Sequence, residues 1–304
     1  MSLAVRRWAW FIVPTIALFL LSACRGPIGS PSPAASTSGV INAVVAENFY
    51  GDIVKQLGGS HVSVTSILSD PNVDPHEYES NVQDAKAIST AQLVLENSGG
   101  YDDWIDKLLS ASPSSNRLLL KAFDFAQIKL PANEHVWYSV DNVQAIAQAI
   151  AGDLKRLDPP GAATFDSNLQ TFYQSLQPLQ QKINDIKAKH AGTPVGLTET
   201  IYLYQAIPEG LKVLTPFAFE KAIAEGNDPP ADTVATANNQ INNRLIKVLI
   251  YNEQTITPLT TNLQNAARAK HIPIVPVTET MPPGKTYQTW MLDQLNALQA
   301  ALGG

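Results

Sequence analysis

The segment Ala162–His190, AATFDSNLQTFYQSLQPLQQKINDIKAKH, contains one continuous helical pattern. Its apolar side chains recur every three or four positions, which places them on one face of a helix. They are Phe165, Leu169, Phe172, Leu176, Leu179, Ile183 and Ile186. Such a helix is roughly 40 Å long at 1.5 Å per residue, and Pro178 is expected to kink it. The pattern spans only about four heptads, so we predict one helix packed across both halves of the protein rather than a coiled coil.

Short apolar runs alternate with amphipathic segments on both sides of this helix. Strands are predicted over 40–46, 61–68, 93–96 and 118–123 before it, and over 195–198, 211–214, 246–251 and 272–277 after it. Helices are predicted over 48–57, 81–91, 102–109, 140–157, 232–243, 258–270 and 286–302. This alternation predicts an α/β fold with two βα lobes and mostly parallel sheets. The N-terminal lobe would cover residues 40–160, the linking helix 161–192 and the C-terminal lobe 193–304.

The N-terminus has the pattern of an export signal. Arg6 and Arg7 precede an apolar run over 8–21 that is short for a membrane span, and small residues lead to Cys24. The ending resembles a bacterial lipoprotein lipobox, so residues 1–23 are expected to be removed and Cys24 to carry lipid. Residues 24–39, rich in Ser, Pro, Ala and Gly, would form a flexible tether. The protein would then be extracytoplasmic and anchored to the cell membrane; an uncleaved membrane anchor is the alternative.

Composition disfavours several classes of partner and binding site. The 304 residues carry a net charge of −6, which disfavours nucleic acid as a partner. Cys24 is the only cysteine, so an intrachain disulfide and a cysteine zinc site are excluded. The sequence contains no Gly-rich phosphate loop or dinucleotide fingerprint. We expect a monomer.

Four potential metal ligands follow predicted strands, two in each lobe. His76 and His135 lie in loops after strands of the first half, and Glu199 and Glu279 directly follow strands of the second half. Ligands of open α/β sheets bind beyond the carboxyl ends of strands. Two neutral imidazoles and two carboxylates balance a divalent cation and suit Zn²⁺, Mn²⁺ or Fe²⁺. Glu253 also follows a strand and is a reserve candidate.

Several motifs resemble the metal-receptor family of ABC-transporter solute-binding proteins, the zinc/manganese type. They are Asp74-Pro75-His76-Glu77-Tyr78-Glu79, the stretch from Asn97 to Trp104, His135-Val136-Trp137 and Thr278-Glu279-Thr280. The long helix also corresponds to the rigid helix of that family. The resemblance implies that His76, His135, Glu199 and Glu279 bind the metal.

The chain departs from the family pattern near the predicted ligands. Asn133-Glu134 stands where Asp-Pro usually precedes the His135 position. Glu199 replaces a histidine of many zinc members, and Glu279 replaces a common aspartate. A histidine-rich loop, common in zinc receptors, is absent from the sequence between 125 and 135.

The resemblance implies a non-enzymatic protein that captures a divalent metal between two lobes and delivers it to an ABC-type permease. Carboxylates favour Mn²⁺, although Zn²⁺ outcompetes Mn²⁺ at most mixed N/O sites; Fe²⁺ is also compatible. The long helix is expected to limit hinge motion, so release would need small rearrangements near the ligands. Two alternatives remain: a metal-dependent hydrolase with the same site, for which His-Glu-x-x-His and Gly-x-Ser-x-Gly are missing, and an adhesin or solute receptor without metal.

Overall fold

A computed structural model describes residues 39–71, 73 and 75–303 of the protein. The predicted signal peptide, Cys24, nearly all of the tether and Asp74 lie outside the described residues. Within the described ranges, none of the helices is both long and apolar enough to cross a membrane.

The N-terminal lobe is built on a parallel sheet with the strand order β2-β1-β3-β4. Its strands are β1 (Ile41–Glu47), β2 (Val62–Leu68), β3 (Leu93–Glu96) and β4 (Leu118–Lys121). Its main helices are α1 (Asn48–Gly58), α2 (Val82–Thr90), α3 (Trp104–Ala111) and α5 (Val140–Leu157). The central strand β1 is buried on both faces, as parallel sheets require. Val45 packs with α1 and α5, whereas Val44 on the other face packs with α2 and α3.

The C-terminal lobe repeats this arrangement with the strand order β6-β5-β7-β8, again parallel. Its strands are β5 (Pro194–Leu197), β6 (Lys212–Val213), β7 (Val248–Asn252) and β8 (Ile274–Val277). Its helices are α7 (Leu203–Ala206), α8 (Phe217–Ala224), α9 (Ala231–Asn242), α10 (Pro258–Ala269) and α11 (Tyr287–Leu302). The predicted α/β class and the parallel sheets are therefore confirmed.

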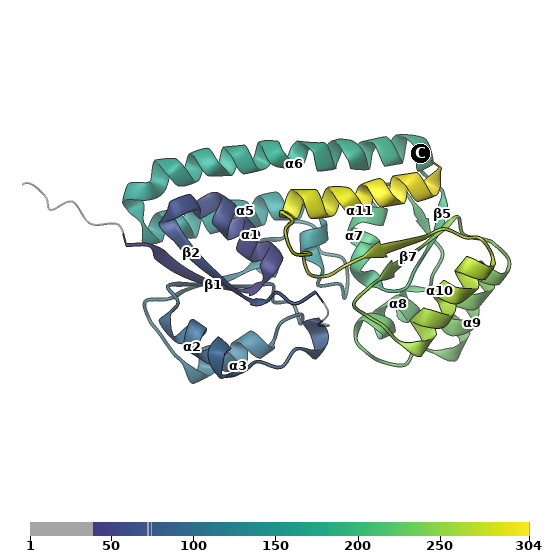
Figure 1. The fold of residues 1–304 in the computed structure, drawn as a ribbon, viewed down its shortest axis with the longest axis horizontal. Coiled ribbons are helices and arrows are strands. Elements are labelled where there is room, and N and C mark those ends of the chain that lie inside the picture. Colours follow the sequence, from purple (N-terminus) through teal and green to yellow (C-terminus); the bar gives the residue numbers. More distant parts are fainter. Residues whose placement is uncertain (1–38, 72, 74, 304) are drawn as a thin grey trace, which may run out of the picture. The chain divides into compact units, whose positions relative to one another are not determined.

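The long helix α6 (Ala162–His190) has the predicted bounds and 29 residues. All seven apolar residues of its predicted face are buried. Pro178 lies inside the helix on its exposed side, and the helix continues through it. Figure 1 shows α6 running past both lobes with α11 beside it. The predicted linking helix is thus part of the core of each lobe.

Five of the eight predicted strands are shorter than expected, and two of them show the reason. The strand predicted over 118–123 ends at Lys121, and the short helix α4 (Ala122–Phe125) follows. Lys121 pairs with Glu96, the last residue of β3, so the strand ends where its neighbour ends. The strand predicted over 211–214 contains only Lys212 and Val213, because β6 is an edge strand that pairs with the first two residues of β5.

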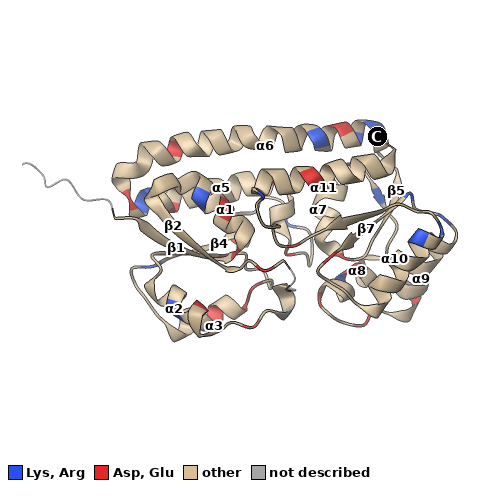
Figure 2. Ribbon diagram, in the orientation of Figure 1, with Lys and Arg blue, Asp and Glu red and all other residues tan. Residues whose placement is uncertain are grey.

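The charged residues of the described chain are spread over many elements. In the view of Figure 2, Lys and Arg lie singly on helices and loops and do not gather on one face. A nucleic-acid partner would need a continuous basic surface along its phosphates.

Candidate metal centre

The predicted ligands lie on loops that leave the carboxyl ends of the parallel strands. His76 belongs to the one-turn 3-10 helix η2 (Pro75–Glu77), which follows β2. His135 directly precedes the 3-10 helix η3 (Val136–Tyr138), and Glu279 follows β8. Asn81 fixes the chain after His76 through a capping box at the start of α2. Asp84 Oδ2 accepts the Asn81 N–H at 2.7 Å, and Asn81 Oδ1 accepts the Asp84 N–H at 3.3 Å.

Three of the four predicted ligands meet between the lobes. The Oε2 atom of Glu279 lies 3.7 Å from His76 Nε2 and 3.8 Å from His135 Nε2. The side chains of His135 and Glu279 are fully buried, and that of His76 is 15% exposed. Two ligand atoms on one tetrahedral Zn²⁺ are about 3.4 Å apart, given bonds of about 2.1 Å. The site therefore fits a metal after contraction by a few tenths of an ångström.

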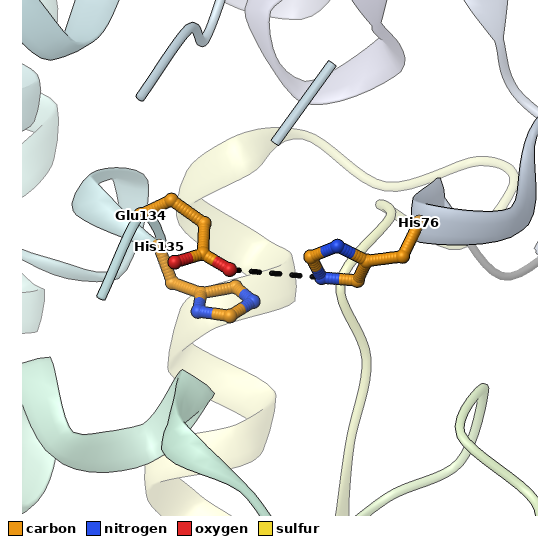
Figure 3. Close-up of side chains that lie close together, drawn as sticks. All are labelled: His76, Glu134 and His135. Carbon is orange, nitrogen blue, oxygen red and sulfur yellow. Dashed lines mark ion pairs between the residues drawn. The ribbon is translucent and has the colours of Figure 1, made fainter. Parts of the chain in front are cut away.

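Glu134 joins this group and was not predicted as a ligand. Its Oε1 atom lies 3.9 Å from His76 Nε2, and ligand atoms of His76, Glu134 and His135 all lie within 4.8 Å of one another. Figure 3 shows the Glu134 carboxylate and the His135 ring side by side, opposite His76. The other oxygen, Oε2, is 3.4 Å from Lys221 Nζ on α8. The sequence could have indicated Glu134, because it directly precedes His135 at a position where the chain departs from the family motif.

Glu199 is connected to the site through a relay of hydrogen bonds. It is buried after β5, and its Oε2 accepts a hydrogen bond from Thr255 Oγ1 at 3.1 Å. Asn252 Nδ2 donates to Thr255 Oγ1 at 2.8 Å and to Glu279 Oε1 at 2.6 Å. Two side chains, Thr255 and Asn252, therefore connect Glu199 to Glu279. Glu253, the reserve candidate, is exposed.

Asn133 sets the tautomer of His135. Its Oδ1 atom lies 3.0 Å from His135 Nδ1 and also accepts the His135 backbone N–H at 3.1 Å. An amide oxygen accepts only, so the His135 proton belongs on Nδ1 and the lone pair on Nε2. That lone pair faces a carboxylate oxygen of Glu279 3.8 Å away, an arrangement that a cation between the two atoms would stabilise. Within the described chain, His135 Nε2 is buried and makes no hydrogen bond.

Glu279 is held as a carboxylate. Its burial would raise its pKa, but the neighbouring imidazoles of His76 and His135 and the hydrogen bond from Tyr101 lower the pKa to about 2. Tyr101 donates its hydroxyl to Glu279 Oε2 at 2.9 Å. Burial and the neighbouring Glu279 charge raise the pKa of Tyr101, so the phenol remains a neutral donor.

Aromatic rings close the site against water. Tyr101 contacts the edges of His76 and His135, with ring centroids 5.0 and 5.7 Å apart. Trp137 lies against His135 at 5.2 Å and stacks on Phe49 at 4.6 Å. A low local dielectric strengthens the attraction between Glu279 and a bound cation.

Solved structures with the same fold bind metals according to their names. The periplasmic zinc binding protein TroA from Treponema pallidum matches with a TM-score of 0.74 and 18% identity over 86% of this chain and 99% of its own. FpvC from Pseudomonas aeruginosa, solved with Mn²⁺, matches with a TM-score of 0.72 and 20% identity over 86% of this chain and 98% of its own. At these identities the likeness establishes the fold.

Sequence comparisons give relatives named for metal binding. The manganese-binding lipoprotein MntA of Halalkalibacterium halodurans is 29% identical over 185 residues, which are 58% of this chain and 58% of the relative. The manganese ABC transporter substrate-binding lipoprotein PsaA of Streptococcus pneumoniae is 28% identical over 178 residues, 54% and 56% of the two chains. The matches thus span somewhat more than half the length of these relatives. The model of the family "Zinc-uptake complex component A periplasmic" matches residues 44–301, and the chain belongs to that family.

Proposed function

We propose that this protein is the metal-binding component of an ABC transporter, which captures a divalent transition metal between its lobes and passes it to a membrane permease. The observation that carries the proposal is the convergence of two imidazole nitrogens on the buried Glu279 Oε2. Membership of the zinc-uptake family and the transporter names of the relatives support it.

We propose His76, His135 and Glu279 as metal ligands, with Glu199 as the fourth. Glu134 competes for the fourth position, because one of its oxygens already faces His76. Either choice supplies two nitrogens and two carboxylates, and so a charge that balances M²⁺. Hard oxygen ligands suit Mn²⁺, whereas Zn²⁺ binds more tightly to most such sites, and Fe²⁺ is also compatible. The cargo is thus Mn²⁺ or Zn²⁺.

The burial of the ligands favours capture over catalysis. A hydrolytic metal site keeps an open position for water and substrate. Here the ligand side chains of His135 and Glu279 are fully buried and aromatic rings cover them. The lipid anchor on Cys24, the extracytoplasmic location and the monomeric state complete the proposal, and the lipoprotein names of the relatives support the first two.

Competitive titration of the chelator-stripped protein with Mn²⁺, Zn²⁺ and Fe²⁺ tests the proposal. We expect one ion per chain. His76→Ala, His135→Ala and Glu279→Ala should each weaken binding by at least about 100-fold, since losses of outer partners alone cost about 10- to 100-fold. His271→Asn, at an exposed histidine, is the matched control. A protein that binds none of the three ions would overturn the proposal.

The fourth ligand is assigned by comparing Glu199→Ala with Glu134→Ala in the same titration. The variant that loses more affinity identifies the coordinating carboxylate. If Glu253→Ala lost more metal affinity than either variant, neither Glu199 nor Glu134 would be the fourth ligand.

A further inference from the structure

Gln254 connects the two ligand loops with a single side-chain amide. It lies two residues after β7 and is half-buried. Its Oε1 atom accepts the N–H of Glu279 at 2.7 Å and of Thr280 at 3.0 Å. Its Nε2 atom donates to the Val73 carbonyl at 3.0 Å and to Thr280 Oγ1 at 2.9 Å. Both donors and both acceptor positions of the amide are therefore used.

These bonds join the lobes at the ligands themselves. Val73 belongs to the N-terminal lobe and lies three residues before His76, while Gln254, Glu279 and Thr280 belong to the C-terminal lobe. We call residues 73 and 75–78 the His76 segment. The Val73 bond ties this segment to the loop that carries Glu279.

The His76 segment is the side of the site where an ion can leave. His76 is 15% exposed, whereas His135 and Glu279 are fully buried. Asn133 holds His135, and Tyr101 and Asn252 hold Glu279. Displacement of the His76 segment is thus the smallest movement that opens the site, and it breaks the bond between Gln254 and Val73.

We propose that Gln254 is a positioning residue that latches the His76 segment over the metal site and thereby slows metal dissociation. This inference rests on the proposed metal-binding function. Because a neutral hydrogen bond contributes modestly to stability, its loss should speed dissociation by about three- to tenfold.

Two substitutions separate the parts of the latch. Gln254→Ala removes all four side-chain bonds. Gln254→Glu keeps an acceptor for the N–H groups of Glu279 and Thr280 but removes the donor to Val73. Its negative charge would by itself retain a cation longer, so faster metal loss in this variant would indicate loss of the bond to Val73.

Gln288→Ala is the matched control. Gln288 and Gln56 exchange two amide hydrogen bonds, at 2.9 and 3.0 Å, between α11 and α1. These bonds also link segments far apart in sequence, but the hydrogen-bond partners of the two glutamines, apart from each other, are Asp52 and Ser175, and neither is a proposed ligand.

The test measures metal loss and backbone opening independently. Chelator-induced release of Zn²⁺ or Mn²⁺ from the loaded full chain is followed by stopped flow, and hydrogen exchange is measured at Val73, His76 and Tyr78 in the metal-free chain. We expect both Gln254 variants, but not Gln288→Ala, to accelerate release and exchange. Unchanged exchange in both variants, or faster exchange with unchanged release, would overturn the latch. A wild-type chain that binds no metal would instead overturn the proposed function, while the exchange measurement would still report whether Gln254 holds the segment.

Discussion

Glu47 is a buried acid whose pKa is raised by its surroundings. It ends β1 with no exposed surface, and its carboxyl group lies close to that of Asp102. Burial and the interaction with the neighbouring Asp102 raise the pKa of Glu47 well above its ordinary 4.5. Burial also raises the pKa of Asp102 to about 6, against the opposing hydrogen bonds from the N–H groups of Ser98 and Asn97. Both neighbouring acids therefore keep their protons to higher pH than exposed carboxyl groups do.

Glu47→Gln should change how stability depends on pH. The unfolded chain loses the Glu47 proton near pH 4.5 and the folded chain keeps it, so the wild type is destabilised as pH rises above that value. An amide donates to Asp102 without this penalty. Urea denaturation from pH 5 to 8 measures this effect. The free energy of unfolding of the variant should rise relative to that of the wild type by up to about 1.4 kcal/mol per pH unit. Glu253→Gln, at an exposed position, is the control. If the free energies of unfolding of the wild type and of Glu47→Gln changed in parallel with pH, the raised pKa of Glu47 would be contradicted.

Three of the four predicted ligands lie close together in the structure, and the sequence could indicate this because strand ends are predictable. His76, His135 and Glu279 all follow strands, and parallel strands end at one edge. Glu134 was missed because side-chain direction in a loop has no period that a sequence reveals. The position of Glu199 was also hidden, since the Thr255 and Asn252 relay between it and Glu279 depends on a distant loop.

Among elements, the bounds of the long helices were predicted more exactly than those of the strands, although the short helices α7 and α8 were not predicted. The bounds of α5 and α6 match the sequence prediction, because helix patterns and caps are local. Strand lengths depend on partners elsewhere in the chain. Thus β4 ends at Lys121, opposite the end of β3, although apolar Ala122 and Phe123 could have continued it.

Pro178→Ala should stabilise the protein through α6. Pro178 has no N–H to donate to the carbonyl four residues earlier, at Gln174, and its side chain is exposed. Alanine restores the bond without touching the buried face. We expect a gain of about 1–2 kcal/mol in the free energy of unfolding. Removing the proline relieves its cost inside the helix, but it also makes the unfolded chain more flexible, which offsets part of the gain.

Denaturant unfolding of Pro178→Ala beside Gln177→Ala measures this effect. Gln177 is the preceding exposed residue of α6, and its substitution should change stability by less than about 0.5 kcal/mol. Equal or lower stability of Pro178→Ala would mean that the proline is accommodated without cost.

At the scale of the whole molecule, the proposed metal centre takes its candidate ligands from both lobes. The two sheets share one strand order, and the loops at their carboxyl ends meet at the site. His76 and His135 come from the N-terminal lobe and Glu279 from the C-terminal lobe. A bound ion therefore links two sheets that α6 and α11 already support (Figure 1).

Metal should consequently raise the unfolding temperature of the whole described fold in one transition. A ligand at 100 times its Kd stabilises the native state by about 2.7 kcal/mol if the unfolded chain does not bind it. For a domain of this size that corresponds to about 5–10 °C. Calorimetry of the chelator-stripped chain with added Zn²⁺ or Mn²⁺ measures the shift. His76→Ala should abolish it while Pro178→Ala retains it, because only His76 lies at the site. Two separate transitions, with only one moved by metal, would instead mean that the lobes unfold independently and that the ion does not couple them.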